Sequence, residues 1–483
     1  MRATQAAGAA PLFASDLQRR SVSFCLVVLI ACELAHLYLG AAVFQIVGRA
    51  ATLAFYAVAL SRLGLRERAL SLVCLILAAA LVLDDKAGLL GRALDQTMFL
   101  VAFIQTMSLL REAAVRSAAI RDVGAFLTRQ PPRRRTWANL LGGHAMGILL
   151  NFGALSLLGP LIQNGVRATS QDQEVAQIRE RRQLSALLRG FSWIVVWAPT
   201  TVTQALIAEN LPASHPPTLM ALGLVTVGLV FTLAWLEDQA MWRKTAARLR
   251  SSGRVLDESA PTPRRPLRDL AGICFMLLGC TLGIRWACGV TTVAALMLTG
   301  PICLVAWTAI QVAPNGLRAI LNETKQVLRD VADGAIPNSA RECATLGASG
   351  FIGVAAAALG ALGTVAHWLA VLQLNPAVLL AVLPLLVVLA AQVALSPIMM
   401  VVFLASIVSA LPEAPADPTL IAFALSCGWA ITMTAAPNAA GALIMSRVTG
   451  HSPYALTWHW NLVFSALAYA VLALGFVVLA GVW

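Results

Sequence analysis

The chain has 483 residues, of which 59% are hydrophobic and 12% are charged, and its mean hydropathy is +0.78. A soluble domain of this length needs far more charge on its surface, so the composition excludes a soluble globular protein. The net charge of +12 is concentrated in loops, chiefly 111–135 and 243–268, as in the cytoplasmic loops of membrane proteins. We therefore expect a lipid bilayer as partner and no nucleic acid.

Apolar runs long enough to span a bilayer recur from residue 22 to residue 482. A spanning helix needs about 20 mostly apolar residues, and no run alternates as the strands of a membrane barrel do. We predict an all-α polytopic membrane protein with roughly ten to thirteen membrane segments. The nine cysteines contain no C-x-x-C pair and lie mostly in apolar runs, so we expect neither disulfides nor a metal site.

The first four apolar runs alternate between basic and acidic loops, as successive crossings should. Arg19 and Arg20 precede an apolar run that is longer than a signal-peptide core. We therefore predict an uncleaved first helix with a cytoplasmic N-terminus in a bacterial inner membrane. Within that helix, Glu33 and His36 are three residues apart and share a face. They form either a proton relay or a structural pair.

The alternation of loop charge fails after the run 140–162, because the following segment 165–189 is basic although it should lie outside. Two interpretations remain. Either one segment between 137 and 189 does not cross, as a re-entrant piece would behave, or 167–189 is an interfacial helix tolerated outside.

Polar stretches divide the chain. The run 241–266 is rich in Pro, Ser and Arg and reads as a cytoplasmic linker, and 315–344 has the spacing of an amphipathic surface helix. We expect five parts: N-terminal helices 1–136, a first repeat core 137–240, the linker 241–266, middle helices 267–344, and a second repeat core 345–483.

The two cores share one gapless match, between residues 189–200 and 427–438. Glycine, an aromatic residue, Ala-Pro and a polar residue occupy equivalent positions in both: Gly190/Gly428, Phe191/Trp429, Ala198/Ala436, Pro199/Pro437 and Thr200/Asn438. The match predicts two inverted-topology repeats, each with a helix that is Pro-broken or re-entrant.

Proline removes an N–H group and clashes with the preceding turn, so a helix breaks or kinks at Pro199 and at Pro437. The freed carbonyls and half-helix N-termini either bond nearby hydroxyl and amide groups or hold an ion or an anionic solute. Recurrence in both cores favours the binding interpretation. The predicted binding residues are Thr200, Thr201, Thr203, Gln204, Asn438, Thr434, Ser396 and Asn151, with Pro397 as a third helix break.

Two interrupted helices with polar tips resemble the ion transporter superfamily, which includes the divalent anion:sodium symporters and the arsenite and sodium/proton permeases. Similar segments are 394–398 (Ala-Leu-Ser-Pro-Ile), 429–438 and 447–453. The likeness covers roughly 140–240 and 345–483. It implies ion and anion binding at the tips, and one rigid part that moves against a scaffold. The symporters carry Ser-Asn-Thr where this chain has Ala-Pro-Thr-Thr and Ala-Pro-Asn-Ala.

We predict a secondary active transporter that moves a small, anionic solute by alternating access, with Na⁺ or H⁺ as the coupling ion and no other cofactor. The chain lacks the Gly-x-x-x-x-Gly-Lys-Ser/Thr loop, so it does not hydrolyse ATP in that way. A homodimer is one option for its assembly. The alternatives are a membrane enzyme acting on lipid-linked substrates, which usually needs a larger polar loop than this chain has, and a structural or assembly protein.

Overall fold

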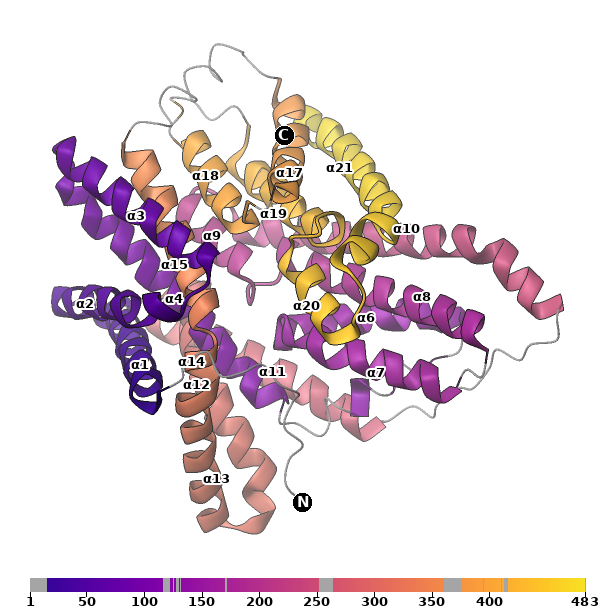
Figure 1. Ribbon diagram of the computed structural model, residues 1–483, viewed down its shortest axis with the longest axis horizontal. Helices are drawn as coiled ribbons and strands as arrows, with labels where there is room; N and C mark the ends of the chain where they lie inside the picture. Colours follow the sequence, from indigo (N-terminus) through magenta and orange to yellow (C-terminus); the bar gives the residue numbers. More distant parts are fainter. Residues whose placement is uncertain are drawn as a thin grey trace. The chain divides into compact units, whose positions relative to one another are not determined.

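The computed structural model describes residues 15–482 except for 116–121, 125, 127–129, 131, 170–171, 252–263, 360–374, 394, 410 and 412–415. Every regular element in these residues is helical, as predicted (Figure 1). Seven of the described helices are long and apolar enough to cross a membrane. Three shorter apolar helices occupy Cys274–Cys288, Pro376–Gln392 and Pro397–Val408. The chain is an all-α, multi-pass membrane protein.

Several of the apolar runs are interrupted, so the helices that they form are shorter than the runs. Helix α6 (Pro132–Leu150) turns at Asn151 into α7 (Gly153–Thr169), and the two pack together as a hairpin. Helices α17 (Pro376–Gln392) and α18 (Pro397–Ser409) form a second hairpin. The first hairpin lies in the segment 137–189, for which both interpretations of the loop charges stay predictions.

The chain packs as two compact units. The first unit comprises residues 1–112 and 284–359, and the second comprises 113–283 and 360–483. The first unit contains α1 (Asp16–Leu39), α2 (Ala42–Ala59), α3 (Leu65–Leu83), α4 (Leu90–Val115), α12 (Thr292–Val312), α13 (Leu317–Asp330), α14 (Ile336–Asn338) and α15 (Ala340–Ala358), with short helices at Leu60–Arg62, Ala87–Leu89, Ala313–Asn315 and Val331–Ala335.

The first unit is held together by polar groups that bond backbone carbonyls across helices. Tyr56 donates from its hydroxyl to the carbonyl of Ala344 at 2.8 Å, and Tyr38 donates to that of Ala294 at 3.1 Å. Arg49 of α2 and Asp95 of α4 form a two-pronged ion pair, with both nitrogen–oxygen distances at 2.7 Å. Such bonds satisfy polar groups that lipid cannot satisfy.

Glu33 and His36 lie in the second half of α1. Glu33 is buried, with 4% of its surface exposed, and His36 follows one turn later with its Nδ1 atom buried and without a hydrogen-bond partner among the described residues. The predicted proton relay stays a prediction.

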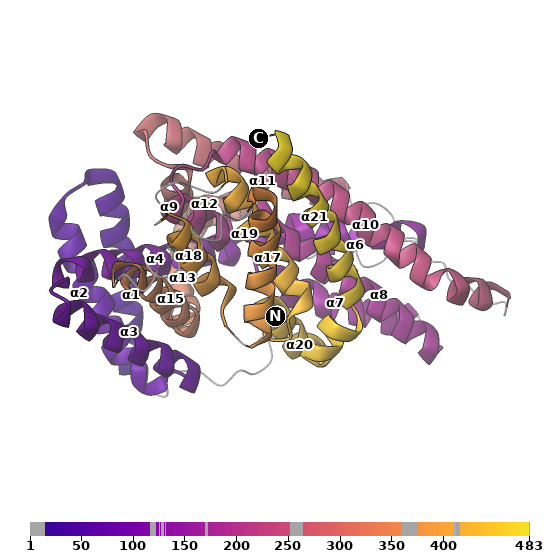
Figure 2. The same cartoon turned by 90° about the horizontal axis from the view of Figure 1, so that it is seen from above.

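The second unit contains both predicted repeat cores. It comprises α6, α7, α8 (Gln173–Ser192), the 3₁₀ turn η3 (Trp193–Val196), α9 (Val202–Asn210), α10 (Pro216–Ser251), most of α11 (Arg264–Cys288), α17, α18, α19 (Pro418–Ala435), α20 (Ala440–Thr449), the π turn η6 (Ala455–His459) and α21 (Leu462–Val482). Helix α6 packs on α8, α17 packs on α19, and α19 is buried throughout (Figures 1 and 2).

Local sequence sets where many of these helices begin. Proline occupies the first helical position of five of them. An N–H group at that position makes no hydrogen bond within the helix, so proline can lack it, and the fixed φ angle of proline suits a helix. These prolines are Pro132, Pro216, Pro376, Pro397 and Pro418. Asp172 and Asp417 cap α8 and α19 by accepting from the N–H groups of the first turn.

Both polar stretches contain helical structure. Helix α10 continues to Ser251, so the first part of the predicted linker 241–266 is helical, and residues 252–263 lie outside the described residues. The predicted amphipathic helix within 315–344 is α13, which exposes Leu317, Leu321 and Leu328.

Candidate functional site

The first predicted break is present between α8 and α9. Helix α8 tightens into η3, the chain runs through Pro199 without helical structure, and α9 begins at Val202. Around the proline, Ala198 N donates to the carbonyl of Ile194 at 2.9 Å, and Thr201 N donates to that of Ala198 at 3.1 Å. The helix stops there because Pro199 cannot donate and excludes the preceding carbonyl.

The second break, between α19 and α20, has the same backbone pattern. Ala436 N donates to the carbonyl of Thr432 at 2.9 Å, and Ala439 N donates to that of Ala436 at 3.0 Å. These bonds fall at the positions that the gapless match of 189–200 with 427–438 makes equivalent. The register read from the sequence therefore agrees with the local backbone at both prolines.

Both broken helices also lie very close to a neighbouring helix. A Cβ atom on Gly190 would lie 2.1 Å from the carbonyl oxygen of Leu140 in α6. A Cβ atom on Gly428 would lie 2.7 Å from the Cα atom of Pro384 in α17. Glycine is needed at both positions because the two backbones touch, which explains one of the matched residues.

His144 of α6 supports the first break. Trp197 donates from Nε1 to Nε2 of His144 at 2.9 Å, so Nε2 is the acceptor and Nδ1 carries the proton. That Nδ1 group lies 3.0 Å from the carbonyl oxygen of Gly190 and donates to it. His144 is therefore a packed, neutral histidine that satisfies a carbonyl near the end of α8.

The first break contains buried hydroxyl groups without partners. Thr200 and Thr203 have 6% and 0% of their surface exposed, and neither hydroxyl oxygen has a hydrogen-bond partner among the described residues. By contrast, Thr201 donates to the carbonyl of Ala198 at 2.8 Å, and Gln204 donates to that of Val195 at 2.8 Å. A buried polar atom left unbonded costs free energy unless a bound group satisfies it.

The second break is tied to the α17–α18 hairpin. Asn438 is exposed, and its amide donates to the carbonyl of Gln392 at 3.3 Å. The side chain of Gln392 in turn donates to the carbonyl of Ala435 at 3.3 Å. Ser396, 7% exposed, follows the turn of this hairpin, and Pro397 begins α18. Thr434 is fully buried and bonds Ser465 of α21 at 2.8 Å.

The predicted binding residues thus fall into three groups within the second unit. Thr200, Thr201, Thr203 and Gln204 lie at the first break, Asn438, Ser396 and Thr434 lie around the second, and Asn151 forms the left-handed turn of the α6–α7 hairpin. Gln204 reaches Ser426 of α19 at 3.5 Å, which joins the first break to the second broken helix. Helices α9 and α20 both begin without a side-chain cap.

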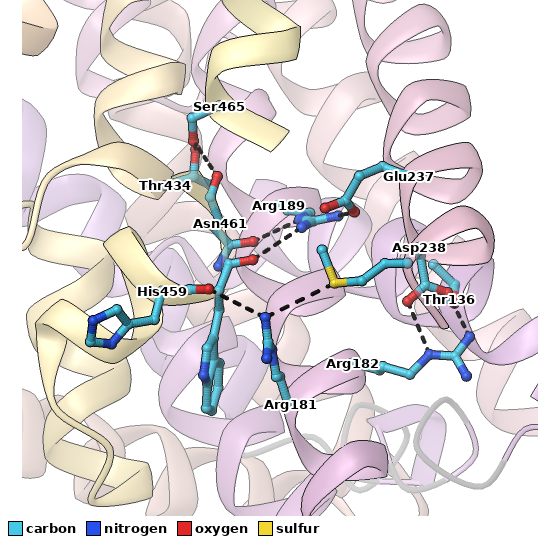
Figure 3. Close-up of polar contacts among 12 residues, drawn as sticks. Thr136, Arg181, Arg182, Arg189, Glu237, Asp238, Thr434, His459, Asn461 and Ser465 are labelled. Carbon is cyan, nitrogen blue, oxygen red and sulfur yellow. Dashed lines mark hydrogen bonds and ion pairs between the residues drawn. The ribbon is translucent and has the colours of Figure 1, made fainter. Parts of the chain in front are cut away.

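A buried charged network lies beside these helices and is not evident from the sequence (Figure 3). Arg189 belongs to the basic segment 165–189, but it is buried in α8 and pairs with Glu237 of α10 at 2.7 Å. Its Nε donates to Asn461 at 2.7 Å. Two turns earlier in α8, Arg182 forms a two-pronged pair with Asp238 at 3.0 and 2.6 Å. An arginine directly before the matched Gly190 was the available signal.

Comparison with known proteins identifies the architecture. No family model matches the chain, and no curated protein matches its sequence. Among solved structures, it is similar to the YdaH transporter of Alcanivorax borkumensis, whose crystal structure has an unusual topology. The TM-score is 0.51 over 79% of this chain and 84% of that chain, at 17% sequence identity. The chain shares the overall fold of that solved structure. The narrower resemblance to the ion transporter superfamily stays a prediction.

Proposed function

We propose that this chain is a secondary active transporter that moves a small, anionic solute across the bacterial inner membrane by alternating access. The observation that carries the proposal is the pair of buried, unpartnered hydroxyls of Thr200 and Thr203 at a helix break, in a chain with a transporter fold. The uncapped N-termini of α9 and α20 add N–H donors and positive dipole ends, which favour an anion. The two breaks belong to repeats of inverted topology.

Alternating access needs two bodies that shift with respect to each other, and the division of the chain into two compact units supports this part of the proposal. Both breaks lie in the second unit, which we propose carries the solute, while the first unit is the scaffold. The coupling ion is Na⁺ or H⁺, and the N-terminus is cytoplasmic, as the basic loops indicate.

The test begins with an unbiased search for the solute. The purified full-length chain is screened by thermal unfolding against a panel of small carboxylates, phosphates, sulfonates and inorganic anions. Each stabilising compound is then offered, radiolabelled, to proteoliposomes with a Na⁺ gradient or a pH gradient. Accumulation against the solute's own gradient supports transport. A compound that binds but never accumulates under either gradient contradicts the transporter proposal.

The site is tested with Thr200→Val and Thr203→Val, which remove a hydroxyl and keep the shape. Neither change removes a hydrogen bond from the free protein, so both variants should unfold at or above the wild-type temperature and lose solute binding at least tenfold. Thr232→Val is the matched control, because Thr232 is exposed on α10 and bonds only its own helix. Wild-type affinity in both site variants would refute the assignment.

A further inference from the structure

A narrow cavity in the second unit lies apart from the two breaks, where α6, α8 and α10 meet the turn before α21. Three arginines line it, namely Arg181, Arg182 and Arg189, with the carboxylates of Glu237 and Asp238. Thr136, Met241 and the indoles of Trp242 and Trp460 complete the charged and aromatic part of the lining. Because Glu237 is engaged by Arg189 and Asp238 by Arg182, one arginine remains in excess. That residue is Arg181.

Arg181 is held by groups that carry no charge (Figure 3). Its Nη2 atom donates to the carbonyl oxygen of His459 at 3.2 Å and lies 4.0 Å from the sulfur of Met241. Its guanidinium lies over the rings of Trp242 and Trp460, 5.3 and 6.0 Å from their centres. No carboxylate in the described residues forms an ion pair with it. Carbonyl and aromatic contacts orient a guanidinium but leave its positive charge for an anion.

The cavity lies at one end of a candidate membrane span. The span in α10 runs from Pro216 to Thr245, so Trp242 is near its end. The basic residues Arg243, Lys244 and Arg248 follow within the same helix. Tryptophan at the end of a span with arginine and lysine beyond it is the arrangement found at the level of lipid headgroups on the cytoplasmic side.

Apolar side chains are exposed beside this cavity on both neighbouring helices. Leu236 and Met241 of α10 have 53% and 39% of their surface exposed, and Leu462 and Val463 of α21 have 50% and 57%. Helices α10 and α21 are in contact. An exposed strip of this kind next to the half-buried Arg181 suits an amphiphile with an anionic head and a hydrocarbon tail better than a free anion.

We propose that this cavity binds the phosphate of an anionic membrane lipid, with Arg181 as the group that pairs with it and the acyl chains lying along α10 and α21. Charge and hydrogen bonding from a planar guanidinium explain why arginine occupies this position.

The test uses the full-length chain, delipidated in a non-ionic detergent. Dioctanoyl phosphatidylglycerol, dioctanoyl phosphatidylcholine and inorganic phosphate are titrated separately, with binding followed by native mass spectrometry and by the unfolding temperature. Phosphatidylglycerol should bind at least fivefold more tightly than phosphatidylcholine, as expected from about 1 kcal/mol per interfacial arginine. Equal affinity for the two lipids overturns the proposal. If inorganic phosphate binds as tightly as phosphatidylglycerol, the proposal that the bound anion belongs to a lipid is also overturned.

Arg181→Gln should lose this preference, whereas Arg66→Gln should keep it. Arg66 is exposed in the first unit and controls for the general attraction of a basic protein to an anionic lipid. Met241→Glu is a second, independent variant that places a negative charge beside Arg181 at a partly exposed position and should also abolish the preference. Should Arg181→Gln fail to fold, Met241→Glu decides. An unchanged preference in either folded variant overturns the proposal.

Discussion

The contact of Gly190 with α6 supports a sharp prediction about stability. Substitution by alanine would place a Cβ atom 2.1 Å from the carbonyl oxygen of Leu140 and 2.8 Å from its Cα and carbonyl carbon. Each of these atoms belongs to the backbone, so no side-chain rotation can relieve the overlap. An ordinary contact begins at about 3.4 Å, so α6 and α8 must separate by roughly 1 Å along their interface.

Overpacking of a close interface costs about 1–3 kcal/mol, and the lack of any flexible group places Gly190→Ala at the upper end. Gly428→Ala meets the Cα atom of Pro384 at 2.7 Å and its carbonyl oxygen at 3.0 Å, so it should cost less. Gly228→Ala is the control, because nothing lies within 4 Å of its added Cβ. Helix propensity should make that variant neutral or slightly more stable.

Thermal unfolding in detergent, followed by intrinsic fluorescence, measures all three variants. At roughly 2–4 °C per kcal/mol for a large unit, Gly190→Ala should unfold about 5–10 °C below the wild type, with Gly428→Ala between the two. If Gly190→Ala unfolds together with Gly228→Ala, α6 and α8 do not touch at this position. A Gly428→Ala variant less stable than Gly190→Ala would refute the ranking by contact distance.

The same measurement tests three polar contacts. Glu237→Leu should destabilise by about 3–5 kcal/mol because it leaves Arg189 buried without its partner, and a second change, Arg189→Met, should recover most of the loss. Arg49→Met should cost only about 1 kcal/mol, since the side chains of Arg49 and Asp95 are 32% and 29% exposed and water screens the pair. His144→Leu should cost about 1–3 kcal/mol, because it leaves the indole N–H of Trp197 and a backbone carbonyl unbonded. Burial does not set the cost of breaking these pairs if Glu237→Leu is no more destabilising than Arg49→Met, or if the Arg189→Met change brings no recovery. An unchanged unfolding temperature in His144→Leu would show that the two hydrogen bonds of His144 do not stabilise the fold.

Features governed by neighbouring residues could be predicted from the sequence. Hydrophobic run length and sparse charge determine a helical membrane protein, since a bilayer leaves few ways to satisfy a spanning backbone. The breaks at Pro199 and Pro437, and their register, were predicted because proline acts on its own helix within one turn. The linker 241–266 stays a prediction, and its first part is helical because α10 continues to Ser251.

Partners far apart in the chain were decided only by the tertiary structure. In sequence, Thr200 and Thr201 look equally able to bond the backbone, yet Thr201 reaches a carbonyl and Thr200 does not. Arg189 reads as one more loop arginine until α10 places Glu237 beside it, 48 positions later in the chain. Run length and proline chemistry are local properties, whereas burial and pairing depend on which helices meet. The sequence by itself therefore determined the class of protein and the position of its breaks, and the packing of the helices decided which polar groups remain free for a ligand.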